Sequence, residues 1–300
     1  MNERKILISG ASGLIGTAVV SSFAAEGWEI NRLVRGNAKR KGDVVWDPAQ
    51  AISPGKVSGF DAVIHLAGEG VFGVWTREKK GRIYDSRIFG TRNLAEGLAQ
   101  AARKPRVFIS ASAIGYYGDR GDEVLREESS SGTGFLAQVC REWEAATAPA
   151  IDPGIRIVNV RTGHVLSAAG GILKKMLLPF RLGVGGKIGD GRQWQSWIHM
   201  ADWLEALRHI MSHDSLRGPV NMAGPNPVTN AEFTKTLAGV LSRPAFFTVP
   251  GIALKAALGA EAANEMLLSG QRVQPGKLIT SGYQFQFPDL QGALRDLLKK

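Results

Sequence analysis

The sequence predicts an α/β fold, in which a doubly wound parallel sheet is followed by a smaller C-terminal α/β part. Short, continuous apolar runs, typical of strands buried on both faces, alternate with amphipathic helical patterns over the first two-thirds of the chain. A glycine-rich turn stands between the first apolar run and the first helical pattern. Together these features are typical of a sheet that binds a ligand at the carboxyl ends of its strands.

The predicted elements alternate as strand and helix. Each strand run is short and rich in Val, Ile and Leu, and each helical run repeats apolar residues every three or four positions. The strands are expected at residues 5–9, 28–34, 44–46, 61–67, 106–112 and 155–161. The helices are expected at residues 14–27, in a stretch that ends with 90–102, and at 135–147.

The alternation breaks at about Leu166, where Gly-rich loops begin, and further helices are predicted at 229–242 and 290–300. We therefore expect a first domain of residues 1–165 and a second, substrate-binding domain of residues 166–300. No low-complexity linker separates them, so the two parts should pack directly together. Some later segments are expected to return to the first sheet.

Composition narrows the function classes. The chain has 300 residues, 44% of them hydrophobic and 21% charged, and it contains no uncharged apolar run of about 18 residues. We therefore expect a globular protein without a membrane span. The single Cys140 and five scattered His exclude an internal disulfide and a multi-Cys metal site. We expect a cytoplasmic protein that holds no metal.

The net charge of +10 has two interpretations, a generally basic surface or positive charge gathered where an anionic cofactor binds. Basic residues cluster at 32–41 and at 77–82. The second cluster is interpreted first as a solvated face, although Arg77, Lys79 and Lys80 follow a predicted strand and could face the ligand crevice. No nucleic-acid-binding motif accompanies the charge, so we do not expect a nucleic-acid partner.

The turn "GASGLIG" places Gly10, Gly13 and Gly16 between the first strand and a helix that begins at about Leu14. Glycines here permit a tight turn and leave backbone N–H groups open to a pyrophosphate at the helix N-terminus. This pattern predicts a Rossmann-type dinucleotide site. Its expected contacts are Gly10, Ser12, Gly13, Leu14, Ile15 and Gly16.

The end of the second strand indicates which dinucleotide binds. An NAD site usually offers a carboxylate there, whereas "INRLVRG" offers Asn31, Arg32 and Arg35, with no acid before Asp43. A guanidinium pairs well with a 2′-phosphate. The sequence therefore predicts NADP(H) as the cofactor.

Two later strands should complete the cofactor site. The strand in "DAVIHLAGEG" ends at Leu66, Ala67 and Gly68, whose small size would let the backbone lie against the cofactor. His65, in the middle of this apolar run, is interpreted as a hydrogen-bonded core histidine. The strand in "VFISASAIGYYGD" is expected to end with Ser110 and Ser112 at the ligand crevice.

These phrases, with "WIHMADW", resemble the extended short-chain dehydrogenase/reductase superfamily of NAD-dependent epimerases and dehydratases. The phrases "SRIFGT", "FLAQVCREWEAA" and "PFRLGVGGKIGDGRQWQSWIH" are similar to a subfamily called epimerase family proteins, which is also labelled sugar-nucleotide epimerase or cell-division inhibitor. The resemblance covers almost the whole chain. It implies an NADP(H)-dependent oxidoreductase or epimerase with a small-molecule substrate.

The resemblance assigns Ser112 as the hydroxyl that bonds the reacting group of the substrate. It also places Glu144 at an acidic position eight residues after the superfamily's catalytic Tyr, which puts Leu136 at the Tyr position and Cys140 at the Lys position. A Tyr hydroxyl shuttles protons near neutral pH only when nearby positive charge lowers its pKa. Leu136 cannot do this, and Cys140 is interpreted as a small buried residue.

Three other side chains are candidates for acid/base work. Tyr116 and Tyr117 follow Ser112 closely, although the glycines around them predict a loop in which they could instead pack or line the pocket. His164, in "RTGHVLS", lies after the next strand, near the expected nicotinamide. His164 and Val165 are alternatively expected to contact the cofactor.

A Gly-rich loop, "GVGGKIGDGRQWQSWIHMADW", is expected to close over the substrate. Cations and aromatic faces suit a sugar or an anionic group, and the substrate contacts are expected to be Lys187, Arg192, Trp194 and Trp197. The alternative for the two tryptophans is packing between the two domains. Asp202 resembles the superfamily's residue that tethers this loop to the following helix.

Two functions share this predicted cofactor site. The first is an NADP(H)-dependent reductase or epimerase in which proton transfer uses Ser112 with an unusual partner or water. The second is a non-catalytic NADP(H)-binding sensor or assembly protein, which the missing Tyr and Lys favour. By analogy with the superfamily, a helix pair beside the sheet could form a homodimer.

Overall fold

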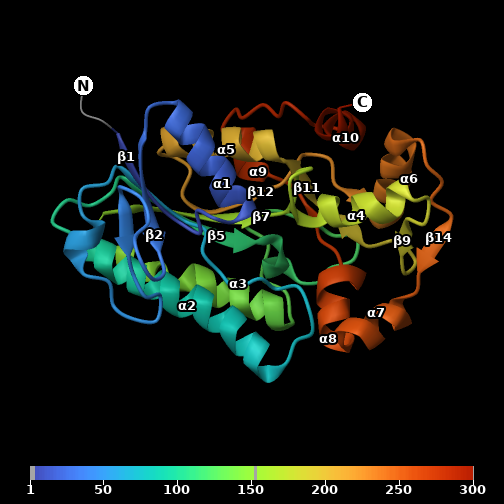
Figure 1. Ribbon diagram of the computed structural model, residues 1–300, viewed down its shortest axis with the longest axis horizontal. Coiled ribbons are helices and arrows are strands. Elements are labelled where there is room, and N and C mark those ends of the chain that lie inside the picture. The colour runs from blue at the N-terminus through green and yellow to red at the C-terminus, as the bar shows by residue number, and fades with distance from the viewer. Residues whose placement is uncertain (1–3, 152–153, 300) are drawn as a thin grey trace.

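The computed structural model describes residues 4–151 and 154–299, and its centre is a seven-stranded sheet (Figure 1). The strand order is β12-β7-β5-β4-β1-β2-β3, and every neighbouring pair is parallel. These strands are β1 (Lys5–Ser9), β2 (Glu29–Val34), β3 (Asp43–Val45), β4 (Ala62–His65), β5 (Val107–Ala113), β7 (Arg156–Thr162) and β12 (Gly218–Met222). The predicted doubly wound parallel sheet, a Rossmann-type fold, is confirmed.

Helices cover both faces of the sheet, as Figure 1 shows. One face carries α1 (Leu14–Ala25) and α5 (Met200–Ser212), and the other carries α2 (Arg77–Ala99) and α3 (Phe135–Ala145). The strands are buried on both sides, so their side chains alternate between two hydrophobic cores. Ile6 and Ile8 of β1 join the α1 and α5 side, whereas Leu7 joins the α2 side.

The segments after residue 165 divide between two places. The helix α5 and the strand β12 belong to the large sheet and its cover. In contrast, α4 (Gly171–Arg181), α6 (Asn230–Leu241) and α10 (Leu290–Leu298) build a separate core around Leu237 and Trp197. Residues 1–165 therefore do not contain the whole sheet unit, because α5 and β12 return to it from later in the chain.

Shorter elements connect these units. The small strands are β6 (Val124–Leu125), β8 (His164–Leu166), β9 (Gly186–Ile188), β10 (Trp194–Gln195), β11 (Trp197–His199), β13 (Val228–Thr229), β14 (Phe247–Val249) and β15 (Arg272–Val273). The remaining helices are α7 (Gly251–Leu258), α8 (Ala260–Ala263), α9 (Gly276–Thr280), the 3-10 turns η1 (Pro54–Val57), η2 (Ile114–Tyr117) and η3 (Ala148–Ala150), and the π-helical turn η4 (Asn264–Leu268).

Asp202 has a structural role, but its partners differ from the expectation. Its fully buried carboxylate accepts hydrogen bonds from the Tyr283 hydroxyl at 3.1 Å and from the backbone N–H groups of Gln286 and Phe287 at 2.7 and 2.9 Å. Asp202 therefore anchors the C-terminal segment to the first turn of α5, and it does not tether the Gly-rich loop. The segment 283–287 covers this turn, so the carboxylate finds its donors there.

Over the described residues, no helix is long and apolar enough to cross a membrane. The same part of the chain contains no group of three or more His, Cys, Asp or Glu side chains that could hold a metal ion.

The packing of α1 against the glycine turn gives a first prediction. A Cβ atom at Gly16 would lie 2.1 Å from the Gly10 carbonyl oxygen, so Gly16→Ala should lower the free energy of unfolding by about 3 kcal/mol in urea denaturation. Gly81→Ala is the matched control, because a Cβ atom at this position in α2 meets nothing within 4 Å and should stabilise the helix by about 0.5–1 kcal/mol. Equal stabilities of the two variants would contradict the packing described here.

Candidate functional site

The glycine turn lies at the carboxyl edge of the sheet, between β1 and α1. Gly10 has φ +69°, and a Cβ atom there would lie 2.6 Å from the carbonyl carbon of Leu66, at the end of β4. Gly13 differs, because its Cβ atom would meet only the Gly10 oxygen at 3.4 Å. The first and third glycines therefore allow close backbone contacts inside the protein, while Gly13 leaves open space in front of the helix.

The N-terminus of α1 is free to bind an anion. Gly13 is the N-cap residue and gives no side-chain cap, and the first turn contains no acidic residue. Ser12 and Gly13 are exposed, and Leu14 packs against Gly170 and Gly171 of a later loop while Ile15 packs into the core. The first N–H groups of a helix have no partner within it and carry its positive dipole end. This cradle fits the pyrophosphate of a dinucleotide.

A buried hydrogen-bond cluster fixes the end of β4 beside this cradle. The Ser9 hydroxyl oxygen accepts the backbone N–H groups of Leu66 and Ala67 at 3.1 and 3.2 Å and lies 2.6 Å from Nδ1 of His65. Burial lowers the pKa of His65 to about 4, so the ring is neutral near pH 7 and its Nδ1 accepts the Ser9 proton. His65 is thus a hydrogen-bonded core histidine, and Ala67 and Gly68 extend past it to the surface.

The basic residues of β2 have different surroundings. Arg32 donates from Nε to Asp43 Oδ1 at 2.9 Å, and its Nη2 lies 2.6 Å from the same oxygen. Arg35 follows the end of β2 and is exposed, so it is a candidate partner for a 2′-phosphate at this edge. Asn31 does not reach the edge, because β2 continues for three residues after it and its buried amide contacts Glu29.

The serines of β5 also differ in position. The strand runs to Ala113, so Ser110 lies inside the sheet with no exposed surface. It is therefore not at the ligand crevice, where the sequence predicted it. Ser112 lies near the end, 4% exposed, and donates to Glu144 Oε1 at 2.7 Å. The guanidinium of Arg161 binds both Glu144 oxygens at 2.8 Å. Glu144 therefore holds the Ser112 proton, and Ser112 Oγ is left as an acceptor.

One face of α3 points to this serine. Leu136, Cys140 and Glu144 are spaced four residues apart, and Gly115 of the turn after β5 lies against both Leu136 and Cys140. Cys140 is buried, and burial raises the pKa of its thiol to about 12. The two positions at which the resemblance predicts a Tyr and a Lys thus hold side chains without a charge near neutral pH.

The two tyrosines after β5 are both tied to Arg161. Tyr117 is fully buried, donates to Asn221 Oδ1 at 2.7 Å and accepts from Arg161 at 3.0 Å, and burial raises its pKa to about 12. Tyr117 is therefore part of the core. The ring of the half-buried Tyr116 stacks on the Arg161 guanidinium, whose carbon lies 3.5 Å from the ring centroid.

His164 and Val165 form the start of β8, directly after β7. The backbone N–H of His164 donates to Ser196 at 2.8 Å, its side chain bonds Gln195, and burial lowers its pKa. The half-buried imidazole is therefore neutral near pH 7. Val165 is buried in the core beside α1.

A pocket of about 410 Å³ opens beside Leu136, at the N-terminus of α3. It lies between the segment after β5 and the segment 261–271, which contributes α8 and the π-helical turn η4. The carboxylate of Glu265 accepts the backbone N–H groups of Phe135 and Leu136 at 2.8 Å each, which is possible because Gly134 has no Cβ atom. Glu265 thus caps α3 from 130 residues away in the sequence, and no local motif marks it.

The predicted substrate residues do not gather at this pocket. Trp197 is 1% exposed and belongs to the second core, so it packs between elements and does not contact substrate. Trp194 donates to Asp122 at 2.8 Å and stacks with Arg272 near the pocket, and Arg192 is exposed. Lys187 lines a different cavity, beside α6.

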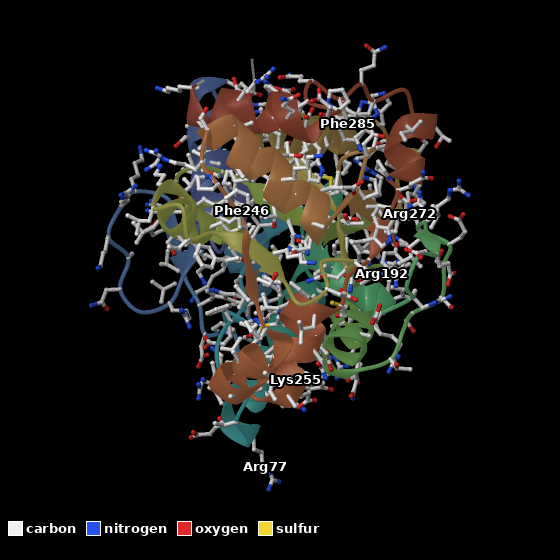
Figure 2. The ribbon with its side chains drawn as sticks, turned by 90° about the vertical axis from the view of Figure 1, so that its right-hand side faces the viewer. Arg77, Arg192, Phe246, Lys255, Arg272 and Phe285 are labelled. Carbon is white, nitrogen blue, oxygen red and sulfur yellow. The ribbon has the colours of Figure 1, made fainter. Side chains whose placement is uncertain are left out.

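The basic cluster at the start of α2 is largely neutralised. Lys79 pairs with Glu69 at 2.7 Å, and Lys80 pairs with Glu261 of α8 at the same distance. Arg77 is exposed at the helix end (Figure 2). Lys80 therefore joins the segment 261–271 to the large sheet unit.

Residues 6–223 match the family described as the NAD dependent epimerase/dehydratase family. The chain belongs to this family. Residues 249–297, from β14 to α10, match a domain of unknown function (DUF1731). The matched regions meet at the pocket beside Leu136, because the first supplies Leu136 and Gly115 and the second supplies Glu265 and Gln271.

Several relatives cover the whole chain. An epimerase family protein of Mycobacterium bovis is 41% identical over 296 residues, which are 98% of this chain and 97% of that protein. The crystal structure of human epimerase family protein SDR39U1 with NADPH superposes with a TM-score of 0.90 at 33% identity, covering 99% of both chains. A nucleoside-diphosphate sugar epimerase from Corynebacterium glutamicum superposes with a TM-score of 0.81 at 37% identity, covering 99% of this chain and 58% of its own.

The neutral state of His65 predicts a pH dependence of stability. Because its pKa is about 4 in the folded protein and 6.5 normally, the unfolded chain binds the proton first as pH falls. The stabilisation by neutral His65 is present above pH 6.5 and decreases by about 3 kcal/mol as pH falls toward 4. Urea denaturation between pH 7 and 4 should show a shallower pH dependence for His65→Asn than for the native chain, and parallel curves would contradict this account.

Proposed function

We propose that this protein is an NADP(H)-dependent oxidoreductase or epimerase that acts on a small molecule. The observation that carries the proposal is the uncapped α1 N-terminus behind Gly13, with the exposed Arg35 at the end of the neighbouring strand. The pyrophosphate of the cofactor would bind the N-terminus of α1, and its 2′-phosphate would bind Arg35. The NADPH complex of human SDR39U1, a relative over the full length, supports this cofactor.

Ser112 is the central residue of the proposed chemistry. When bound, NADP(H) would supply or accept a hydride. Since Glu144 holds the Ser112 proton and Arg161 binds both oxygens of that carboxylate, Ser112 Oγ accepts a hydrogen bond from a substrate hydroxyl and positions it. The substrate is proposed to enter the pocket that Leu136 lines.

The proton must come from a group other than a tyrosine at position 136, where the resemblance predicts one. Leu136 has no proton to transfer, and the pKa values of about 12 at Tyr117 and Cys140 keep both neutral. His164 is the candidate base, because it is neutral and half-buried after β7, and Tyr116 is the candidate acid beside Arg161. Water in the pocket is the third route for the proton.

A non-catalytic NADP(H)-binding sensor or assembly protein is the second candidate function. The observation that favours it is that Leu136 and Cys140 occupy the positions expected for the catalytic Tyr and Lys, so neither position holds a charged group that could transfer a proton. In that case the segment 261–271 would change its contacts with α3 when the cofactor binds.

The cofactor assignment is tested by Arg35→Asp. Calorimetric titration should show tight binding of NADPH to the native chain and weak binding of NADH, and the variant should lose about 100-fold in NADPH affinity because a charge-assisted hydrogen bond becomes a repulsion. Lys104→Asp is the charge-matched control, since Lys104 is exposed before the amino end of β5, at the opposite edge of the sheet. Equal NADPH affinities for the two variants, or a preference of the native chain for NADH, would contradict the assignment.

The catalytic assignment is tested by Ser112→Ala. Native protein saturated with NADP⁺ should oxidise a substrate hydroxyl in a small-molecule extract of the source cells, followed as NADPH formation at 340 nm, and Ser112→Ala should reduce this oxidation rate about 100-fold with cofactor affinity unchanged. Ser212→Ala is the control, because Ser212 is exposed at the end of α5. Tight NADPH binding with the same oxidation rate in all three proteins would favour the sensor.

A further inference from the structure

A second cavity, of about 460 Å³, lies between α6 and the strand pair β9 and β14. It shares no lining residue with the pocket beside Leu136 and includes none of the glycine turn. Its size is within the range of roughly 300–1,000 Å³ that is usual for small-molecule sites. Figure 2 views the molecule from this side, where Phe246 and Lys255 are labelled.

The charged side chains of this cavity are all positive. Lys187, Lys235 and Arg243 line it, and no Asp or Glu does. None of the three has a carboxylate partner among the described residues, whereas Lys79 and Lys80 do. Lys187 reaches only the backbone oxygen of Asp190, at 3.3 Å. Three unpaired cations around one concave surface attract an anion.

Thr234 provides a hydrogen-bonding group without a partner in the same cavity. It is 5% exposed, and its buried Oγ1 atom has no hydrogen-bond partner among the described residues. Thr236, two residues later in α6, instead donates to the backbone oxygen of Glu232 at 2.8 Å. Buried hydroxyls are nearly always bonded, so the unpartnered Thr234 hydroxyl is a hydrogen-bonding group that a ligand in this cavity could use.

The remaining wall is apolar and held by tight backbone contacts. Phe246 is 90% exposed and Phe247 is 56% exposed, although both line the cavity. A Cβ atom at Gly186 would lie 1.9 Å from the Phe247 carbonyl oxygen, so the glycine lets β14 lie directly on β9. Phe247 is thus part of a paired strand and Phe246 directly precedes it, and the two side chains give the cavity an apolar surface beside the cations.

We propose that this cavity binds a small organic phosphate, a phosphate ester that carries an apolar or aromatic group. The phosphate accepts hydrogen bonds from Lys187, Lys235, Arg243 and the Thr234 hydroxyl, and the apolar group covers Phe246 and Phe247. This ligand is separate from the dinucleotide and from the substrate, because the three sites are lined by different residues. Lys187 acts here, and not in the substrate pocket.

The test uses phenyl phosphate as the probe, with the protein saturated with NADPH to keep the probe away from α1. Ligand-observed NMR titration should show binding that is about tenfold tighter than that of inorganic phosphate, which lacks the ring, and of benzyl alcohol, which lacks the charge. Lys235→Glu should weaken phenyl phosphate binding about tenfold, and Thr234→Val should weaken it by about threefold.

Lys255→Glu is the control, because it makes the same charge change on the same side of the molecule, in α7, outside the cavity (Figure 2). It should alter the affinity by less than about twofold. Failure of phenyl phosphate to bind, or equal affinities for Lys235→Glu and Lys255→Glu, would overturn the proposal. Inorganic phosphate binding as tightly as phenyl phosphate would overturn the role of Phe246 and Phe247. These comparisons keep their meaning if NADPH does not bind, since Lys235→Glu and Lys255→Glu both leave the glycine turn and α1 unchanged.

Discussion

The contact of the Gly10 turn with the end of β4 sets the geometry on which the cofactor site depends. With its positive φ and no side chain, Gly10 brings β1 and α1 within van der Waals distance of Leu66. The Ser9 hydroxyl then accepts the backbone N–H groups of Leu66 and Ala67 and donates its proton to neutral His65. The helix N-terminus is therefore aimed at one point on the sheet edge, and a charged His65 or a larger residue at position 10 would displace it.

A second constraint joins the two halves of the candidate active site. Arg161 is buried with Glu144, Tyr116 and Tyr117 around it, and Glu144 in turn holds Ser112. From the other side, Glu265 caps α3 and Lys80 pairs with Glu261. The helix that carries Leu136 is thus fixed at its N-terminus by the DUF1731 segment and at its C-terminal end by Arg161. Movement of that segment would change the pocket directly.

The outcomes for individual residues show where sequence reasoning succeeds. Periodicity located the strands of the parallel sheet up to β7, because a strand buried on both faces requires a continuous apolar run. The assignments of Ser110 and Asn31 differ from the structure, because the ends of β5 and β2 lie three residues beyond them and side chains alternate between faces. Trp197 and Lys187 lie in a loop region whose path follows no periodic pattern, so neither could be placed from spacing alone.

The sequence by itself determined the local features, because each depends on neighbours a few residues away. These are the succession of first strand, glycine turn and first helix, the absence of an acid between Glu29 and Asp43, and the common face of Leu136, Cys140 and Glu144. Only the tertiary structure decided that Asp43 pairs with Arg32 and not with Arg35, that Glu265 caps α3, and that Thr234 lies unpartnered among three cations. Those contacts join segments that are distant in the chain, and their partners are selected by packing rather than by local pattern.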